Sequence, residues 1–125
     1  MDVLSSRLLL RPTDWHRSAA FYRDALGLAT FREFGTPDHP GVVFFLGGGF
    51  LEISRGETSS PSISLWLQVR DVRAEEDCLR NAGVELAKAA ERMPWGLIES
   101  WMLDPEGNEL RLIEIPDDHP IRRRL

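Results

Sequence analysis

The pattern of apolar and polar positions along the chain occurs twice. Residues 6–29 and residues 63–87 each open with alternating apolar positions, which are typical of a strand, and continue with apolar positions at helical spacing. Each predicted helix lies between residues that often begin and end helices, namely Asp14 and Gly27 in the first copy and Asp71 and Gly83 in the second. Each half therefore predicts a strand followed by a helix.

Three further strand-like runs follow each predicted helix. They span residues 29–34, 42–46 and 50–54 in the first copy, and residues 84–87, 97–103 and 109–115 in the second. Glycines 47–49 and the sequence DPEGN at 104–108 predict tight turns before the last strand of each copy. We therefore expect an α+β fold in one domain of 125 residues, made of two βαβββ modules at 5–55 and 63–115, a polar linker at 56–62 and a tail at 116–125.

Strand alternation gives each predicted sheet one face toward its helix and one face away from it. Leu8 and Leu10, like Leu65 and Leu67, suit the helix side. The other side then carries Arg7, Leu9, Phe50, Glu52 and Ser54 in the first copy, and Ser64, Trp66, Gln68, Glu109, Arg111 and Ile113 in the second. Large apolar residues mixed with a few polar ones are typical of a ligand cavity. Within it, a buried Glu52 needs a cation or a metal beside it.

Three stretches of the sequence resemble one known family. FYRDALGL at 21–28 and DPEGNE at 104–109 together resemble the vicinal oxygen chelate superfamily, which includes lactoylglutathione lyase, extradiol dioxygenases and bleomycin-resistance proteins. MPWGLIESWMLDPEGN at 93–108 is similar to a segment of the bleomycin-resistance branch. The resemblance implies paired βαβββ modules whose sheets curl around a cleft, usually within a homodimer.

The same resemblance identifies four positions that hold a metal in the metal-dependent members, mostly through His, Glu and Gln. In this sequence those positions are Arg7, Glu52, Ser64 and Arg111. Arginine has no lone pair to offer, and serine is a poor ligand for zinc or iron. A divalent metal is therefore disfavoured, and we expect no cofactor. We expect instead that Arg7 and Arg111 pair with Glu52 and fill the space that a metal would take.

Tryptophans supply the remaining candidates for ligand binding. Trp66 shares a predicted face with Ser64 and Gln68, so it is the best candidate for a stacking wall. Trp95 precedes the strand at 97–103 and is a candidate for the cavity rim. The face of Trp101 stays open, because both alternating sets of that strand mix apolar and polar residues. Simple packing is the alternative interpretation for each tryptophan.

Composition and charge limit the classes of partner and the cellular compartment that fit this sequence. The net charge of −5 argues against nucleic acid, which needs a basic face. A single cysteine excludes an internal disulfide and fits a reducing compartment. No apolar run is long enough to span a membrane, and the first residues lack the pattern of a signal peptide, so we expect a cytoplasmic protein. The three histidines, His16, His39 and His119, share no ligand spacing and are predicted to lie at the surface.

Three kinds of function fit these observations. The first is metal-free binding of a small planar, aromatic or antibiotic-like molecule, with Arg7, Glu52, Gln68 and Arg111 as polar anchors. The second is an enzyme, either a metal-free isomerase or cyclase with Glu52 as the base or, less favoured, a metal-dependent lyase or dioxygenase. The third is a pseudoenzyme that acts through its dimer surface. Two arginines suit an anionic ligand and the acidic net charge suits a cationic one, so the charge of the ligand stays open.

Overall fold

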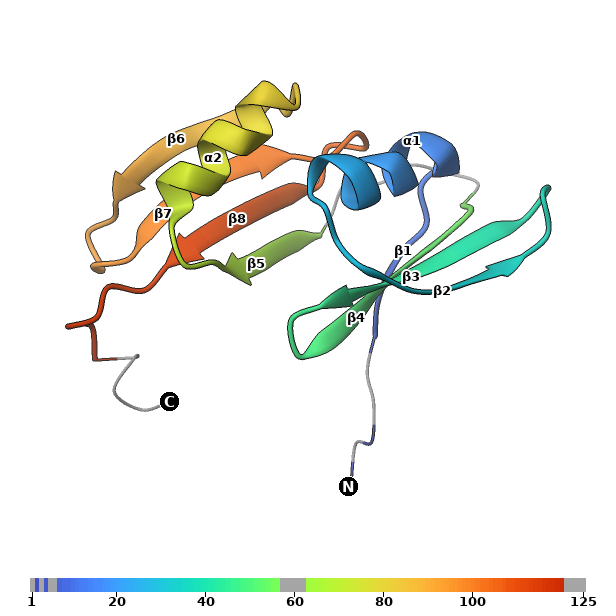
Figure 1. Cartoon of the computed structure of the whole chain (residues 1–125), viewed down its shortest axis with the longest axis horizontal. Coiled ribbons are helices and arrows are strands. Elements are labelled where there is room, and N and C mark those ends of the chain that lie inside the picture. The colour runs from blue at the N-terminus through green and yellow to red at the C-terminus, as the bar shows by residue number, and fades with distance from the viewer. Residues whose placement is uncertain (1, 3, 5–6, 57–62, 121–125) are drawn as a thin grey trace. The chain divides into compact units, whose positions relative to one another are not determined.

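The computed structural model describes residues 2, 4, 7–56 and 63–120. The chain divides into two compact units, Met1–Ser60 and Pro61–Leu125, and each contains one four-stranded sheet and its helix (Figure 1). The predicted linker at 56–62 lies outside the described residues except for Gly56. The prediction of two βαβββ modules is confirmed, because both units have the same order of elements.

The first unit contains β1 (Arg7–Leu10), α1 (Trp15–Ala20), η1 (Phe21–Ala25), β2 (Thr30–Gly35), β3 (Pro40–Leu46) and β4 (Gly49–Ser54). Its sheet has the order β1-β4-β3-β2, in which β1 runs parallel to β4 and the other pairs are antiparallel. Asp14 caps α1 as predicted, because its Oδ1 accepts a hydrogen bond from the backbone N of Arg17 at 3.1 Å.

The first helix differs from the prediction in its second half. The α-helix gives way at Phe21 to a wider π turn, η1, in which the backbone N of Leu26 donates to the carbonyl of Phe21 at 2.9 Å. Tyr22 stays fully buried within this turn, and Gly27 follows with a φ of 71°. In the wider turn, a backbone N–H bonds to the carbonyl five residues before it instead of four. Tyr22 nevertheless stays in the core, so the spacing of apolar residues alone did not reveal the π turn.

The second unit contains β5 (Ser64–Gln68), α2 (Val72–Asn81), β6 (Leu86–Arg92), β7 (Ile98–Leu103) and β8 (Glu109–Glu114). Its sheet has the order β5-β8-β7-β6, with β5 parallel to β8. Asp71 caps α2 as predicted, because its Oδ1 accepts from the backbone N of Ala74 at 3.0 Å. The DPEGN sequence forms the predicted turn, in which Gly107 N donates to Asp104 O at 3.0 Å.

Strand β6 is longer than predicted. It continues to Arg92, whereas the sequence pattern ended it at residue 87. Its register against β7 shifts between Leu86 and Lys88 and again between Lys88 and Glu91. Each irregularity breaks the two-residue alternation that identifies a strand in a sequence, which explains why the pattern stopped early.

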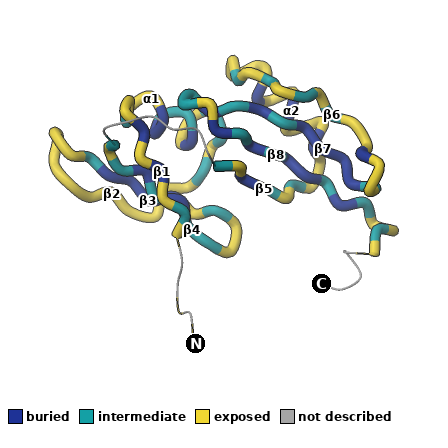
Figure 2. The backbone as a smooth tube through the Cα atoms, turned by 180° about the vertical axis from the view of Figure 1, so that it is seen from behind, coloured by how far each residue is buried: buried dark blue, intermediate teal, exposed yellow. Residues whose placement is uncertain are grey.

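Each helix covers one face of its own sheet and leaves the other without a helix (Figure 1). Figure 2 shows that the buried backbone follows the central strands of each unit. The core includes Leu51 and Ile53 on β4 and Leu110 and Leu112 on β8, all on the helix side of their sheets. We call the opposite side of each sheet its helix-free face. The residues that the sequence placed away from the helices lie on these two faces.

Candidate functional site

Glu52 on the helix-free face of the first sheet has the arginine partner that the sequence predicted on its own module. The Nη1 atom of Arg7 donates to Glu52 Oε1 at 2.8 Å. Arg7 lies beside Phe50 in the β1–β4 register, so its side chain reaches diagonally across the strands to Glu52. The Glu52 side chain is only 18% exposed, and the guanidinium supplies the positive charge that a half-buried carboxylate needs.

A cluster of phenylalanines lies beside this ion pair on the same sheet. The rings of Phe31, Phe45 and Phe50 contact one another, with centroids 4.9 to 5.7 Å apart. Phe31 and Phe45 are each 45% exposed. Tilted and edge-on rings that remain accessible form an apolar surface able to receive a flat apolar group.

A row of aromatic and cationic side chains crosses the helix-free face of the second sheet. In the strand register Trp66 lies beside Arg111, Arg111 beside Trp101, and Trp101 beside Lys88. The structure therefore places Trp101 on the helix-free face, which the sequence left open. Trp66 is 53% exposed, so one large indole surface of this row is available to a ligand.

Arg111 occupies the centre of the row and has two contacts. Its Nε donates to Glu109 Oε1 at 2.6 Å, and its guanidinium lies 4.0 Å from the centroid of the Trp101 ring. The contact with the indole is a cation–π interaction that fixes the plane of the guanidinium. Its two terminal nitrogens make no hydrogen bond within the part of the chain that the structure describes. The predicted pairing of Arg111 with Glu52 would join the two units, and it stays a prediction.

Glu99 is the residue of this face that sequence reasoning missed. Its carboxylate is almost fully buried, yet no arginine or lysine within the described ranges pairs with it. Trp95 Nε1 donates to Glu99 Oε2 at 2.6 Å, and Trp101 Nε1 donates to Glu99 Oε1 at 2.9 Å. The available signal was the spacing of Glu99 and Trp101, which are two residues apart and share a strand face.

The other predicted residues lie as follows. Ser64 and Gln68 are exposed on β5, and Ser64 Oγ is 3.5 Å from Glu109 Oε1. Trp95 lies in the loop before β7, where it is 52% exposed, and its place at a cavity rim stays a prediction. The sequence predicts Ile113 on the face away from the helix, among the residues of a ligand cavity. It is instead fully buried in a cluster with Leu97 and Ile115. This end of the helix-free face is therefore filled by the unit's own side chains.

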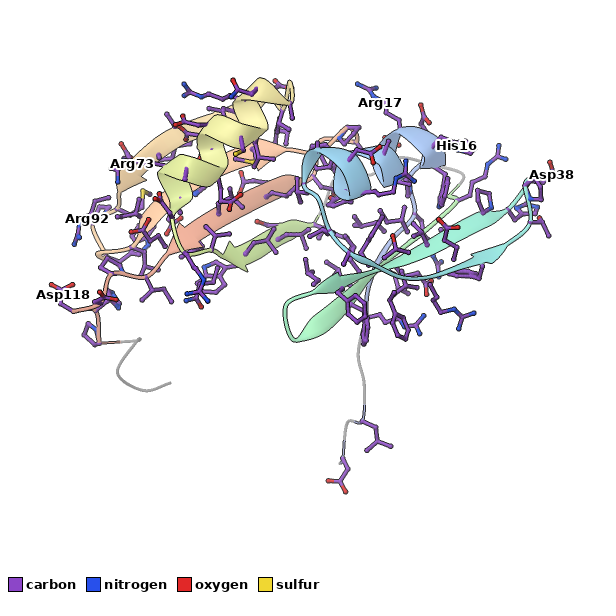
Figure 3. The ribbon with its side chains drawn as sticks, viewed as in Figure 1. His16, Arg17, Asp38, Arg73, Arg92 and Asp118 are labelled. Carbon is purple, nitrogen blue, oxygen red and sulfur yellow. The ribbon has the colours of Figure 1, made fainter. Side chains whose placement is uncertain are left out.

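The histidines do not form a metal site. His16 and His39 are exposed, and Figure 3 shows His16 on α1 and Asp38 at the tip of the β2–β3 hairpin. His119 is half-buried, with its Nε2 2.9 Å from the carbonyl oxygen of Trp95. Within the described ranges, no three His, Cys, Asp or Glu side chains lie close enough together to hold a metal ion. No described helix has the length and apolar character needed to cross a membrane.

Comparison with known proteins identifies the family. The model of the Glyoxalase/Bleomycin resistance protein/Dioxygenase superfamily matches residues 5–112. The chain belongs to this superfamily. The match spans both βαβββ modules, so it covers all of the β1–β4 sheet and the second sheet through most of β8. A search of curated proteins found no significant match.

Solved structures of other proteins share the fold. A member from Sphaerobacter thermophilus DSM 20745 is 24% identical with a TM-score of 0.73, and the alignment covers 90% of this chain and 98% of that one. Lactoylglutathione lyase from Agrobacterium tumefaciens is 20% identical with a TM-score of 0.69, covering 91% and 94%. TioX from Micromonospora sp. ML1 is 22% identical with a TM-score of 0.74, covering 90% and 98%. At this level of sequence identity, the structural similarity supports the fold alone. The activity has to be inferred from the residues of the site.

The residues at the superfamily's metal-binding positions do not fit a metal. Arg7 places a cation beside Glu52, the one carboxylate of the set, and occupies one of its oxygens. In the second unit, the corresponding residues are Arg111, which is a cation, and Ser64, which offers only a hydroxyl. Guanidinium groups donate hydrogen bonds and repel a divalent ion, so no reaction step through a metal follows from these side chains.

Proposed function

We propose that this superfamily member binds a small planar molecule with an anionic group, without a metal, and that the helix-free face of its second sheet holds that molecule. The observation that carries the proposal is the geometry of Arg111. Its guanidinium lies over the Trp101 ring, 4.0 Å from the ring centroid, and Arg111 is flanked in the register by the exposed Trp66. A carboxylate or phosphate would accept from the outward nitrogens, while the aromatic body of the ligand would stack on Trp66.

The pairing of charges on both faces supports an anionic ligand over a cationic one. Glu52 is paired with Arg7, Glu109 with Arg111, and Glu99 receives two indole N–H groups. Each of these carboxylates thus already accepts from a donor, whereas the two terminal nitrogens of Arg111 have no acceptor among the described residues. Local pairing outweighs the net charge of −5 because a ligand in contact senses the nearest groups most strongly.

Binding without turnover is the simplest form of this function. The Arg7 contact occupies one oxygen of Glu52, which opposes the use of that carboxylate as a catalytic acid or base. A metal-free isomerase or cyclase with Glu52 as its base is the alternative, and consumption of a bound ligand would reveal it. We expect the protein to act as a cytoplasmic homodimer with no nucleic-acid or membrane partner.

The test is a titration of the full chain with 2-naphthoate, monitored by tryptophan fluorescence. We expect saturable binding that weakens about tenfold or more in Arg111→Ala, because a charge-assisted bidentate contact is worth more than 1 kcal/mol. Naphthalene-2-methanol, which keeps the rings and removes the charge, should bind weakly to both proteins.

Arg73→Ala is the matched control for this titration. Arg73 is exposed on α2, the helix that covers the other face of the same sheet (Figure 3). Its removal changes the net charge by the same amount as Arg111→Ala but should leave naphthoate affinity unchanged. Equal losses in both variants would show that naphthoate responds to overall charge, and the proposed site would be wrong.

A further inference from the structure

The buried carboxylate of Glu99 has an unusual set of partners. A buried carboxylate is normally paired with a cation, but the two hydrogen bonds that Glu99 receives from the described part of the chain come from neutral indole N–H groups, one on each carboxylate oxygen. Trp101 is a strand residue, whereas Trp95 comes from the loop before β7. One carboxylate therefore joins a fixed strand indole to a loop indole.

The indoles that bind Glu99 are in turn connected to the proposed ligand site. Trp101 carries the guanidinium of Arg111 on its ring face. The backbone of the Trp95 loop is held as well, by bonds from Met93 N to Leu97 O at 2.8 Å and from Gly96 N to Met93 O at 2.8 Å. The Trp95 side chain nevertheless remains 52% exposed. The hydrogen bond to Glu99 therefore opposes rotation of its indole.

Only a carboxylate can make both contacts at this position. A carboxylate is acceptor-only and has two oxygens, so it can receive two N–H donors that approach from different sides. A glutamine has the same length, but its amide nitrogen would point a donor at one of the two indole donors. Aspartate keeps two acceptor oxygens but is one methylene shorter. Glutamine and aspartate variants therefore separate the number of acceptors from the reach of the side chain.

We propose that Glu99 is a positioning residue for ligand binding, which sets the orientations of Trp95 and Trp101 and, through Trp101, the plane of Arg111. The inference rests on the proposed function, because it assigns the preorganisation of that same face. An aromatic surface fixed before the ligand arrives loses less conformational entropy on binding. Glu99 itself is buried beneath the indoles and is not required to touch the ligand.

The first test needs no ligand. In a proton–nitrogen NMR spectrum of the full chain, the Nε1–H signals of Trp95 and Trp101 should exchange slowly with solvent and shift downfield, because their acceptor is a carboxylate. Trp95→Phe and Trp101→Phe assign the two signals. Trp66 Nε1 has no acceptor among the described residues and should exchange fastest. Trp15 Nε1 donates to the carbonyl of Ile53 at 2.8 Å and provides a protected reference in the other unit.

The variant Glu99→Gln should move the signals of Trp95 and Trp101 upfield and speed exchange of at least one of them, while Trp15 stays unchanged. Glu99→Asp should release one indole and keep the other, and it serves as the second variant if the glutamine protein folds poorly. Unchanged Trp95 and Trp101 signals in both variants would overturn the role of Glu99.

The second test links the indoles to binding. We expect the affinity for 2-naphthoate to fall about tenfold in Glu99→Gln. Glu75→Gln, an exposed position on α2, should bind like the wild type. If the indoles are released but Glu99→Gln binds naphthoate normally, Glu99 orders the side chains without positioning the site, and the inference fails. If wild-type protein binds no naphthoate, the proposed function fails instead, and the NMR result alone decides whether Glu99 holds the two indoles.

Discussion

Two buried serines show how much the partner of a side chain matters. Ser18 on α1 and Ser100 on β7 are both almost inaccessible to solvent. Ser100 Oγ lies 2.5 Å from Glu76 Oε2, whereas Ser18 Oγ has no hydrogen-bond partner among the described residues. A buried hydroxyl without a partner costs free energy, while one that serves a carboxylate stabilises the fold.

The same substitution should therefore have opposite effects at the two positions. Ser18→Ala removes an unsatisfied hydroxyl and improves helix propensity, so we expect the free energy of unfolding to rise by about 0.5 kcal/mol. Ser100→Ala removes a donor from a buried carboxylate and should lower it by about 2 kcal/mol. Urea unfolding followed by circular dichroism measures both values. A clear loss of stability in Ser18→Ala would show that its hydroxyl is satisfied.

At the scale of elements, Glu76 connects α2 to the irregular part of β6. Its Oε2 accepts from Ala90 N at 2.6 Å and from Ser100 Oγ, and its Oε1 lies 3.5 Å from Arg80. Ala90 lies between Lys88 and Glu91, where the register against β7 shifts. The carboxylate thus satisfies a backbone donor at a place where the strand ladder is interrupted.

Removing this carboxylate should loosen β6 more than any exposed change on the same helix. We expect Glu76→Ala to lower the free energy of unfolding by about 3 kcal/mol, because it removes the acceptor of Ala90 N and leaves the buried Ser100 Oγ with only the carbonyl of Lys88, at 3.2 Å. The exposed neighbour Glu75→Ala should change it by less than about 0.5 kcal/mol. Hydrogen exchange of the Ala90 amide reports the local effect, and continued protection in Glu76→Ala would contradict the assignment.

The sequence was most informative where one face of an element is uniformly apolar. Asp14 and Asp71 predicted the two helix starts because an aspartate followed by helical spacing has few other interpretations. The faces of β7 were not predictable, since Ser100 is as buried as Met102 on the helix side and Glu99 is buried on the other. Burial of polar residues through specific hydrogen bonds leaves no periodic pattern. The spacing of Glu99 and Trp101 puts both on one strand face, but it does not show that hydrogen bonds bury the Glu99 carboxylate.

At the scale of the whole molecule, the two modules share a fold but carry different chemistry on equivalent strands. The first helix-free face has an internal ion pair, Arg7 with Glu52, next to phenylalanines. The second has Arg111 between two tryptophans. The repeat and the arginines could be read from the sequence, because they depend on position along strands. The partners of Arg111 could not, because they depend on which rotamer its neighbours adopt.

The residues at the superfamily's ligand positions predict that the protein will not retain a divalent metal. After incubation with zinc, nickel, manganese, cobalt or iron(II) and dialysis, mass spectrometry should find far less than one metal ion per chain. The reason is that Arg7 pairs with Glu52, the one carboxylate at the superfamily's ligand positions, at 2.8 Å, and that Ser64 and Arg111, the ligand positions of the second unit, are poor metal ligands.

The variant Arg7→His tests the same reasoning in the opposite direction. It removes the guanidinium from Glu52 and supplies an imidazole, which is a metal ligand, at the neighbouring position of β1. Metal retention should then rise above the wild-type level, although Ser64 and Arg111 still limit it. Arg73→His adds a histidine on α2 and controls for surface binding. About one tightly held metal per wild-type chain would show that these positions accept a metal despite their arginines, and lyase and dioxygenase assays would then take precedence over ligand screening.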